Sequence, residues 1–210
     1  YRQYGEPNGF RYDCDGEITV DDHTIHCYKN ETHGLQNFTE LFANSCNAGF
    51  ASVGLTIKKS EFTSAADSLL FNADLPSPVR YKSSRFTLNN DSGTALTMQT
   101  SIGQGNTLVT PYHMCLIAAA IANDGALMKP YLVDRIENDS GTEIKSYEPV
   151  SYGLLIDKSE AAFLQDLMKA TVEEGTGSKL QSSNYTAAGK TGTADFKSEK
   201  QENYGKSDYC

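Results

Sequence analysis

The amino-acid sequence predicts an α+β fold, in which a helical subregion accompanies part of an antiparallel sheet. Two patterns predict it: apolar residues recur at helical spacing in separate stretches, and short alternating runs bounded by turn residues indicate strands. The 210 residues are 39% apolar and 21% charged, which is enough for a packed core in one ordinary domain or two small ones.

Three regions follow one another, and we expect them to form one partial domain over residues 1–210. Residues 1–34 are rich in Gly, Asp, Asn and Tyr and contain the alternating run Glu17–Val20, which indicates loops with a small hairpin. Residues 35–130 are expected to be mainly helical. Residues 131–210 are expected to contain strands, one helix and a final strand.

The helical region opens with a short amphipathic stretch. Phe38, Leu41 and Phe42 fall at i, i+3 and i+4, so they share one face. The polar run Asn-Ser-Cys-Asn at 44–47 predicts a break, because short polar side chains bond to the backbone and compete with the helix. Apolar positions resume after it, and a further helical stretch is predicted at 60–70.

The most regular helix is predicted between residues 110 and 125. Thr110 is a natural N-cap, Pro111 suits the first helical position and Gly125 ends the helix. Its apolar stripe is expected to consist of Met114, Cys115, Ala118, Ile121 and Ala122. The preceding segment 75–106 contains Pro, Ser, Asn and Gly residues and is predicted to be mostly loop.

Strands and one further helix are predicted in the C-terminal part of the chain. Residues 132–137 and 143–147 are expected to pair across a polar turn, and a capping box beginning at Asp157 starts a helix. The buried face of that helix is expected to be Phe163, Leu164, Leu167 and Met168. Residues 187–196 are predicted to form a strand that carries Gly-Lys-Thr-Gly-Thr-Ala at 189–194.

Charge and hydropathy bear on possible partners. The net charge is −9 and the 18 basic residues are scattered, so clustered Lys and Arg that could neutralise nucleic-acid phosphates are missing from the sequence. The sequence contains no run of 18 apolar residues that could span a bilayer. We therefore expect no nucleic acid and no anionic membrane surface as a partner of this stretch.

The cysteine count limits the possible pairings, because five cysteines cannot all pair within one molecule. Cys14 and Cys27 flank a polar stretch and are expected to form a disulfide across a hairpin or to remain free thiols. A metal site built from Cys14, His23, His26, Cys27 and His33 is disfavoured, since the spacing matches no common zinc framework. We therefore expect neither a metal nor a cofactor.

The Gly-Lys-Thr-Gly run near the C-terminus can be interpreted in two ways. A phosphate loop would need a glycine where the sequence has Asn184, and a helical stripe after the run, which is missing. The alternative is a strand motif, in which Lys190 supplies a cation beside the hydroxyls of Thr191 and Thr193. Such a group suits the terminal carboxylate of a substrate, whose backbone could lie close to Gly192.

Four blocks in a fixed order carry a resemblance to a known family. They are Ser45-Cys46-Asn47, Ile102-Gly103-Gln104-Gly105, Gly175-Thr176-Gly177 and Lys190-Thr191-Gly192-Thr193. In this order they resemble the transpeptidase domain of penicillin-binding proteins, and the second block, with the Thr-Pro and the Ala-rich helix after it, is similar to that of the class B enzymes. The resemblance covers residues 10–196.

The resemblance implies a fold and an activity. The fold would be the serine β-lactamase-like fold of the penicillin-binding transpeptidases, here incomplete at both ends. The activity would be that of a serine-type peptidoglycan D,D-transpeptidase, which acts through a serine ester on D-Ala-D-Ala stem peptides and is acylated by β-lactam antibiotics. The parent protein would be anchored in the bacterial cell membrane and act on its extracytoplasmic face.

The same resemblance implies roles for the Ser-x-Asn motif. Ser45 would relay protons towards the leaving group. Asn47 would donate a hydrogen bond to the substrate amide and help to hold the catalytic lysine. Cys46 lies between them and is expected to be a packed small residue rather than a nucleophile.

Roles for the Lys-Thr-Gly motif also follow from the resemblance. Lys190 would supply positive potential, and Thr191 and Thr193 would hold the terminal carboxylate beside the open backbone at Gly192. The backbone N–H of Thr193 would be one donor to the oxyanion that forms during acyl transfer. The other donor would belong to the nucleophile.

One motif of the family is missing from this sequence. Ser-x-x-Lys carries the nucleophile and its base and precedes Ser-x-Asn in the family, yet residues 1–44 contain no serine. We therefore expect a fragment that runs from just after that motif to just after Lys-Thr-Gly, lacks the family's following strands and is inactive alone. The alternatives are a β-lactamase or β-lactam-sensor domain, a non-catalytic scaffold, and nucleotide binding at Lys190.

Overall fold

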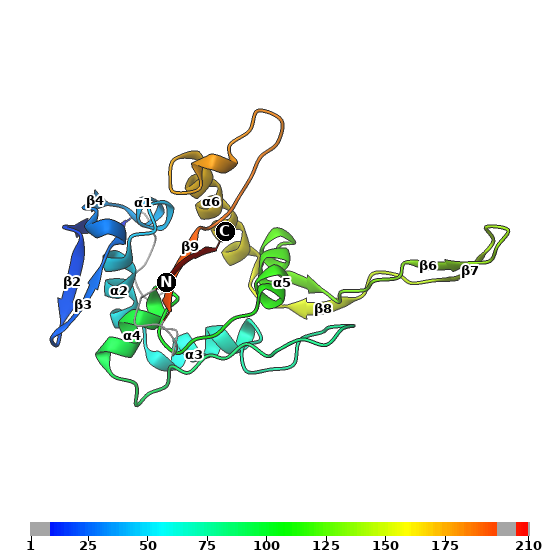
Figure 1. Ribbon diagram of the computed structural model, residues 1–210, viewed down its shortest axis with the longest axis horizontal. Helices are drawn as coiled ribbons and strands as arrows, with labels where there is room; N and C mark the ends of the chain where they lie inside the picture. Colours follow the sequence, from blue (N-terminus) through cyan, green and yellow to red (C-terminus); the bar gives the residue numbers. More distant parts are fainter. Residues whose placement is uncertain (1–8, 197–204, 210) are drawn as a thin grey trace. The chain divides into compact units, whose positions relative to one another are not determined.

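The computed structural model describes residues 9–196 and 205–209 (Figure 1). The chain divides into two units. The first unit comprises Tyr1–Ser64, Thr87–Thr107 and Leu164–Cys210, and the second comprises Ala65–Phe86 and Leu108–Phe163. Each unit is therefore assembled from segments that are far apart in the sequence. Among the described helices, none combines the length and the apolar character that crossing a membrane requires.

Two small antiparallel strand pairs open the first unit. β1 (Tyr12–Cys14) pairs with β4 (Gly34–Gln36), and β2 (Glu17–Val20) pairs with β3 (His23–His26), which the 3-10 helix η3 (Tyr28–Asn30) connects to β4. Asp21 and Asp22 have φ values of 49° and 62°, as a tight two-residue hairpin turn requires. The small hairpin predicted within residues 1–34 is confirmed, and a second strand pair accompanies it.

The first helices follow the predicted pattern and its break. They are α1 (Phe38–Ala43), α2 (Asn47–Thr56) and α3 (Lys59–Ser68). A capping box starts α1, in which the Asn37 side chain accepts the N–H of Glu40 at 2.9 Å and the Glu40 carboxylate accepts the N–H of Asn37 at 2.7 Å. The break predicted at 44–47 is confirmed, because α1 ends at Ala43 and α2 begins at Asn47.

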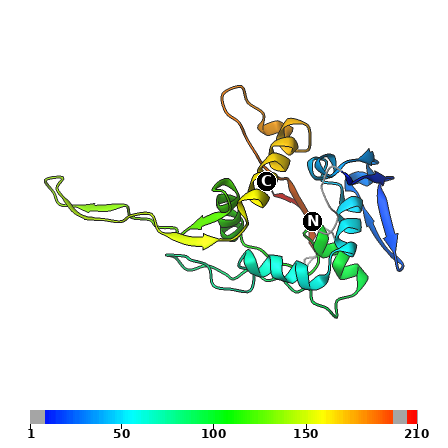
Figure 2. The ribbon, with the colours of Figure 1, turned by 180° about the vertical axis from the view of Figure 1, so that it is seen from behind.

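The core of the first unit gathers around α2, which lies beside the β2–β3 hairpin in both ribbon views (Figures 1 and 2). Leu41, Cys46 and Ala48 are fully buried there, together with Cys14 and Cys27. A Cβ on the helical Gly49 would overlap the side chain of Leu41. The missing side chain therefore lets α1 pack directly against α2.

The helix α4 (Thr94–Ser101) also lies against α2, because Gly54 leaves room for the side chain of Ser101. The prediction of loop over 75–106 is wrong for this segment. The buried side chains of α4 are Thr97, Met98 and Thr100. Only one of them is apolar, so the sequence carries no apolar stripe that would indicate the helix.

In the second unit, α5 (Pro111–Ala122) confirms the predicted cap but not the predicted stripe. Thr110 Oγ1 accepts the backbone N–H of His113 at 3.2 Å. Met114 is 47% exposed and Cys115 is exposed. The buried face consists of His113, Leu116, Ile117 and Ala120. The helix is apolar on nearly every side, so periodicity alone could not select the face that packs.

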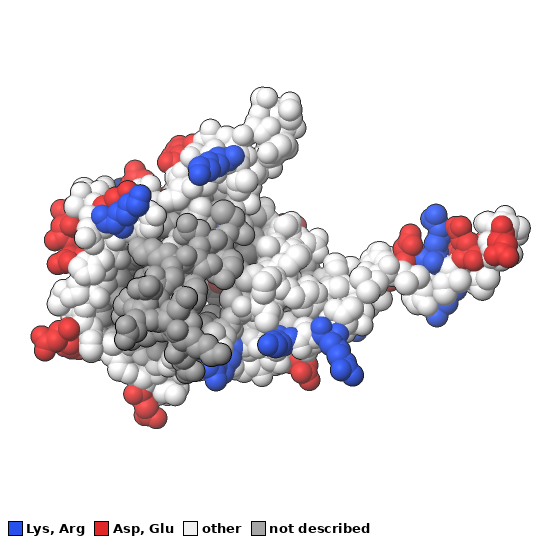
Figure 3. All heavy atoms as spheres, viewed as in Figure 1, with Lys and Arg blue, Asp and Glu red and all other residues white. Residues whose placement is uncertain are grey.

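Two strand pairs complete the second unit. β5 (Ala126–Met128) pairs with β8 (Ser151–Leu154), and β6 (Arg135–Glu137) pairs with β7 (Glu143–Ser146). The second pair confirms the hairpin predicted from 132–137 and 143–147, whereas the first was not predicted. Charged side chains of both signs gather on the exposed β6–β7 hairpin (Figure 3), where Arg135 and Glu137 form an ion pair of 2.6 Å.

The C-terminal part holds α6 (Lys158–Glu173), the 3-10 helix η4 (Ser178–Leu180) and the pair β9 (Gly192–Phe196) with β10 (Gly205–Tyr209). Of the four residues predicted to be buried in α6, only Leu167 is fully buried, and the other three are half-buried. The strand predicted over 187–196 begins only at Gly192. It pairs antiparallel with β10, for which no strand was predicted.

The turn at Gly125 generates a stability prediction. Gly125 has φ +85°, and a Cβ there would overlap the carbonyl oxygen of Ile156. Gly141 has a similar φ of +80°, but nothing lies within 4 Å of its Cβ position. Gly125→Ala combines a left-handed backbone cost of about 1–2 kcal/mol with an overpacking cost of about 1–3 kcal/mol, whereas Gly141→Ala carries only the first.

We therefore expect Gly125→Ala to lower the free energy of unfolding more than Gly141→Ala does. Urea denaturation of the two variants and the parent chain measures both losses. Equal losses would show that the contact with Ile156 relaxes without cost.

Candidate active site

The turn between α1 and α2 carries Ser45, the first residue of the Ser-x-Asn motif. Its φ of +54° lies in the left-handed region, which serine adopts rarely. The backbone N–H of Ser45 donates to the Phe42 carbonyl and that of Cys46 donates to the Leu41 carbonyl, both at 3.1 Å. These two bonds close the end of α1 and hold the turn, so backbone geometry determines where the Ser45 side chain begins.

Ser45 lies in a cluster with three residues from the C-terminal part of the first unit. The hydroxyl–ammonium cluster consists of Ser45, Thr176, Lys190 and Thr191. Ser45 Oγ lies 3.2 Å from the Oγ1 atoms of both threonines, which are themselves 2.7 Å apart. Lys190 Nζ donates to Ser45 Oγ at 2.5 Å and to the carbonyl of Thr191 at 3.1 Å. The fold thus joins the Ser-x-Asn motif to the Lys-Thr-Gly motif directly.

Thr176 is held in this cluster by the end of α1. Its backbone N–H and its hydroxyl both donate to the Ala43 carbonyl oxygen, at 3.1 and 3.2 Å. The neighbouring Gly175 lies so close that a Cβ would overlap the backbone of Ala43. A side chain at 175 would therefore push Thr176 away from Ser45.

The ammonium of Lys190 has a perturbed protonation equilibrium. The residue is exposed at the surface, but its Nζ lies beside Ser45 and 5.7 Å from the centre of the Phe42 ring. Desolvation of the ammonium in these surroundings lowers the pKa of Lys190 to about 8. A lysine with such a pKa can be a cation or a proton acceptor within about one pH unit of neutrality.

The other predicted site residues lie outside this cluster. Asn47 is the first residue of α2, and its Nδ2 donates to the carbonyl of His26 at 3.0 Å. Gly192 and Thr193 open β9, where they pair with Tyr209 and Asp208. The structure therefore joins Ser45 with Lys190 and Thr191, and places Asn47, Gly192 and Thr193 on the elements beside them.

Thr176 is the member of the cluster to which the sequence assigned no role. The signal was present, because Gly175-Thr176-Gly177 is one of the four blocks, but nothing in a Gly-Thr-Gly run says what its threonine contacts. The hydroxyl–ammonium cluster can bind a carboxylate through one cation and several hydroxyls, or pass a proton between oxygens at hydrogen-bond distance.

The structure bears on two alternatives that the sequence raised, a phosphate loop at Lys190 and a nucleophilic Cys46. A phosphate loop requires a helix after Gly-Lys-Thr, whereas the strand β9 follows it here, so that interpretation is wrong. Cys46 is fully buried, as a packed residue should be.

Comparisons with known proteins identify the family of the chain. Residues 8–209 match the family model described as the penicillin-binding protein transpeptidase domain. The peptidoglycan D,D-transpeptidase PbpA of Mycolicibacterium smegmatis is 33% identical over 170 residues, 80% of this chain and 33% of that protein. Stage V sporulation protein D of Bacillus subtilis is 27% identical over 181 residues, 85% of this chain and 28% of that protein. The chain thus spans about a third of the length of these relatives.

Solved structures show the same fold. The D,D-transpeptidase domain of a peptidoglycan glycosyltransferase from Eggerthella lenta has a TM-score of 0.79 at 24% identity, covering 92% of this chain and 49% of that one. Penicillin-binding protein A of Mycobacterium tuberculosis, solved as a penicillin G acyl-enzyme complex, has a TM-score of 0.77 at 24% identity, covering 94% and 45%. The predicted α+β fold is thereby confirmed, and the chain belongs to the penicillin-binding protein transpeptidase family.

Proposed function

We propose that this chain is part of a serine-type peptidoglycan D,D-transpeptidase that transfers acyl groups between stem peptides. The observation that carries the proposal is the contact of Lys190 Nζ with Ser45 Oγ, which unites two motifs of this family in one hydrogen-bonded cluster. The names of the related proteins support the same chemistry. We infer one partial transpeptidase domain over residues 1–210, within a longer parent protein.

The nucleophile in this proposal is a serine of a Ser-x-x-Lys segment outside the sequence. Its Oγ attacks the carbonyl carbon of the penultimate D-alanine, the amide C–N bond breaks, and the terminal D-alanine leaves with a proton on its amine. In this proposal Ser45 Oγ passes that proton, and its hydrogen-bond distance to both threonine hydroxyls and to Lys190 supports the role. The amine of a second stem peptide then takes the acyl group.

The anionic end of the substrate is assigned to the Lys-Thr-Gly strand. Lys190 and the hydroxyl of Thr191 supply a cation and a donor to a terminal carboxylate. The hydroxyl of Thr193 would donate a second hydrogen bond to this carboxylate, and its backbone N–H would donate one to the oxyanion. Gly192 at the start of β9 leaves the strand open to a substrate backbone.

The role of Asn47 rests on the motif rather than on a contact. Its Nδ2 is engaged by the His26 carbonyl. Donation to a substrate amide therefore requires the side chain to exchange that partner when the substrate binds.

The expected partners are peptidoglycan stem peptides and β-lactam antibiotics. A β-lactam carries a carboxylate and a strained amide. Its carboxylate can therefore bind to the Lys-Thr-Gly strand while its amide acylates the serine. Peptidoglycan lies outside the cytoplasmic membrane, and we propose that the parent protein is anchored in that membrane and works on its outer face.

The location of the nucleophile is testable by mass spectrometry. We expect a reporter penicillin to add covalently to a version of the protein that includes the Ser-x-x-Lys segment, and not to residues 1–210 alone. Intact masses before and after incubation measure both outcomes. An adduct on neither folded protein would indicate a non-catalytic scaffold, and an adduct on residues 1–210 would place the nucleophile within them.

The relay role of Ser45 predicts a loss of rate in the extended protein. Ser45→Ala should lower the penicillin acylation rate constant by about 10²–10⁴-fold, because general acid–base contributions are of this size. Ser183→Ala, in an exposed loop of the same unit, is the matched control and should leave the rate unchanged. Acylation rates that are equal in both variants would contradict the relay role.

The lowered pKa of Lys190 predicts the pH dependence of acylation. The ammonium is protonated below its pKa of about 8 and neutral above it, so binding of an anionic penicillin should weaken as the pH rises through about 8. Lys190→Arg keeps its charge to above about pH 12 and should move this falling limb to higher pH. If penicillin binding weakens at the same pH in the parent and in the variant, the titrating group is not Lys190.

A further inference from the structure

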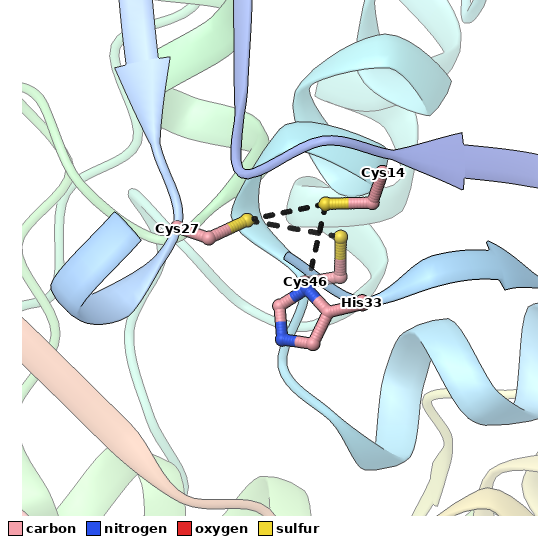
Figure 4. Close-up of side chains that lie close together, drawn as sticks. All are labelled: Cys14, Cys27, His33 and Cys46. Atoms are coloured by element: carbon pink, nitrogen blue, oxygen red, sulfur yellow. Dashed lines mark hydrogen bonds between the residues drawn. The ribbon is translucent and has the colours of Figure 1, made fainter. Parts of the chain in front are cut away.

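Three buried cysteines and one histidine converge beside the Ser-x-Asn turn (Figure 4). Cys14 ends β1, Cys27 follows β3, His33 precedes β4 and Cys46 is the N-cap of α2. The cysteines are 1%, 3% and 0% exposed in that order, and all of them are free thiols. Three sulfurs and an imidazole nitrogen therefore meet in the core of the first unit, outside the hydroxyl–ammonium cluster.

The four ligand atoms lie at the spacing of a tetrahedral metal site. Cys14 Sγ is 3.7 Å from Cys27 Sγ and 3.4 Å from His33 Nδ1, and Cys27 Sγ is 3.9 Å from Cys46 Sγ. All four atoms lie within 4.8 Å of one another. Around a zinc ion with Zn–S bonds of about 2.3 Å and a Zn–N bond of about 2.0–2.1 Å, tetrahedral geometry places sulfurs about 3.8 Å apart and sulfur about 3.5 Å from nitrogen.

The first turn of α2 provides the outer contacts that metal-bound sulfurs usually have. The N–H of Gly49 donates to Cys46 Sγ at 3.4 Å, and the N–H of Ala48 is hydrogen-bonded to the thiol of Cys27. Such donors at a helix N-terminus stabilise the thiolate form, which is the form that binds metal.

We propose that Cys14, Cys27, His33 and Cys46 bind one zinc ion in a closed structural site. The protein supplies all four ligands, which leaves no position for water or substrate and fits a structural rather than a catalytic ion. The ion joins the β1–β4 and β2–β3 pairs to the N-cap of α2. Because Cys46 follows Ser45 directly, the ion also fixes the turn that presents Ser45.

This ligand set corrects the interpretation of the sequence. Of the five residues considered for a metal site, Cys14, Cys27 and His33 belong to the cluster, while His26 Nδ1 instead contacts the Glu17 carboxylate at 2.9 Å. His23 is exposed on β3. Cys46 was assigned only a packing role, because it lies far along the chain and inside another motif.

The first test measures metal on the unaltered protein. We expect the untagged chain, purified without chelator, to carry about one zinc ion per molecule by elemental mass spectrometry after dialysis. Cobalt(II) added to the metal-free protein should produce the intense visible bands of tetrahedral cobalt together with sulfur-to-cobalt charge transfer. Removal of zinc with a chelator should make three further thiols reactive towards a thiol reagent, one for each cysteine of the cluster.

Ligand replacements identify the site. Cys14→Ser and His33→Ala should each weaken zinc binding by more than about 100-fold, since changes to outer-shell partners alone cost 10–100-fold. The matched controls are Cys115→Ser, an exposed cysteine of α5, and His23→Ala, an exposed histidine of β3. Both controls should retain the full zinc content.

Three results would overturn the proposal. One is a parent chain that retains no zinc and gives no thiolate-to-cobalt band. Another is a disulfide between Cys14 and Cys27 in the peptide map of the non-reduced protein, because it consumes two ligands. The last is an unchanged zinc content in the Cys14 and His33 variants. None of these measurements uses penicillin or peptidoglycan, so they test the zinc site independently of the proposed transpeptidase activity.

Discussion

The left-handed turn at Ser45 is the constraint on which both sites of the first unit depend. It ends α1, begins α2 and places two neighbouring side chains in different surroundings. Ser45 Oγ contacts the threonines and the lysine of the hydroxyl–ammonium cluster, whereas Cys46 Sγ lies among the buried cysteines. A residue with positive φ costs backbone energy, and the packing on each side of the turn supplies the contacts that maintain it.

The surroundings of that turn also explain the electrostatics of the site. Lys190 approaches it with its ammonium among hydroxyls and near the Phe42 ring, where no carboxylate neutralises it in the contacts of the described residues. Partial desolvation lowers its pKa towards neutrality, and the remaining positive charge is available to an anionic ligand. A closed zinc site on the other side of the turn would bring rigidity without competing for that ligand, because none of its four ligands belongs to the hydroxyl–ammonium cluster.

Local signals predicted the elements that local interactions stabilise. Thr110 with Pro111 marked the start of α5, and the polar run at 44–47 marked the break between α1 and α2. The same kind of reasoning failed for α4, whose buried residues are mostly threonines, and for the buried face of α5. In both cases the deciding factor is a neighbouring segment that is distant in the sequence, such as α2 beside α4, where Gly54 admits Ser101.

The sequence by itself determined the family, because four short blocks and their order along the chain can be recognised without knowing the structure. The family resemblance also predicted that Ser45, Lys190 and Thr191 belong to one site, because it joins their motifs, and the structure places these three residues in contact. Only the tertiary structure decided that Thr176 completes their cluster and that Cys46 joins Cys14, Cys27 and His33. Those contacts form when the chain brings remote segments together, and the spacing of residues along a sequence carries no information about such distances.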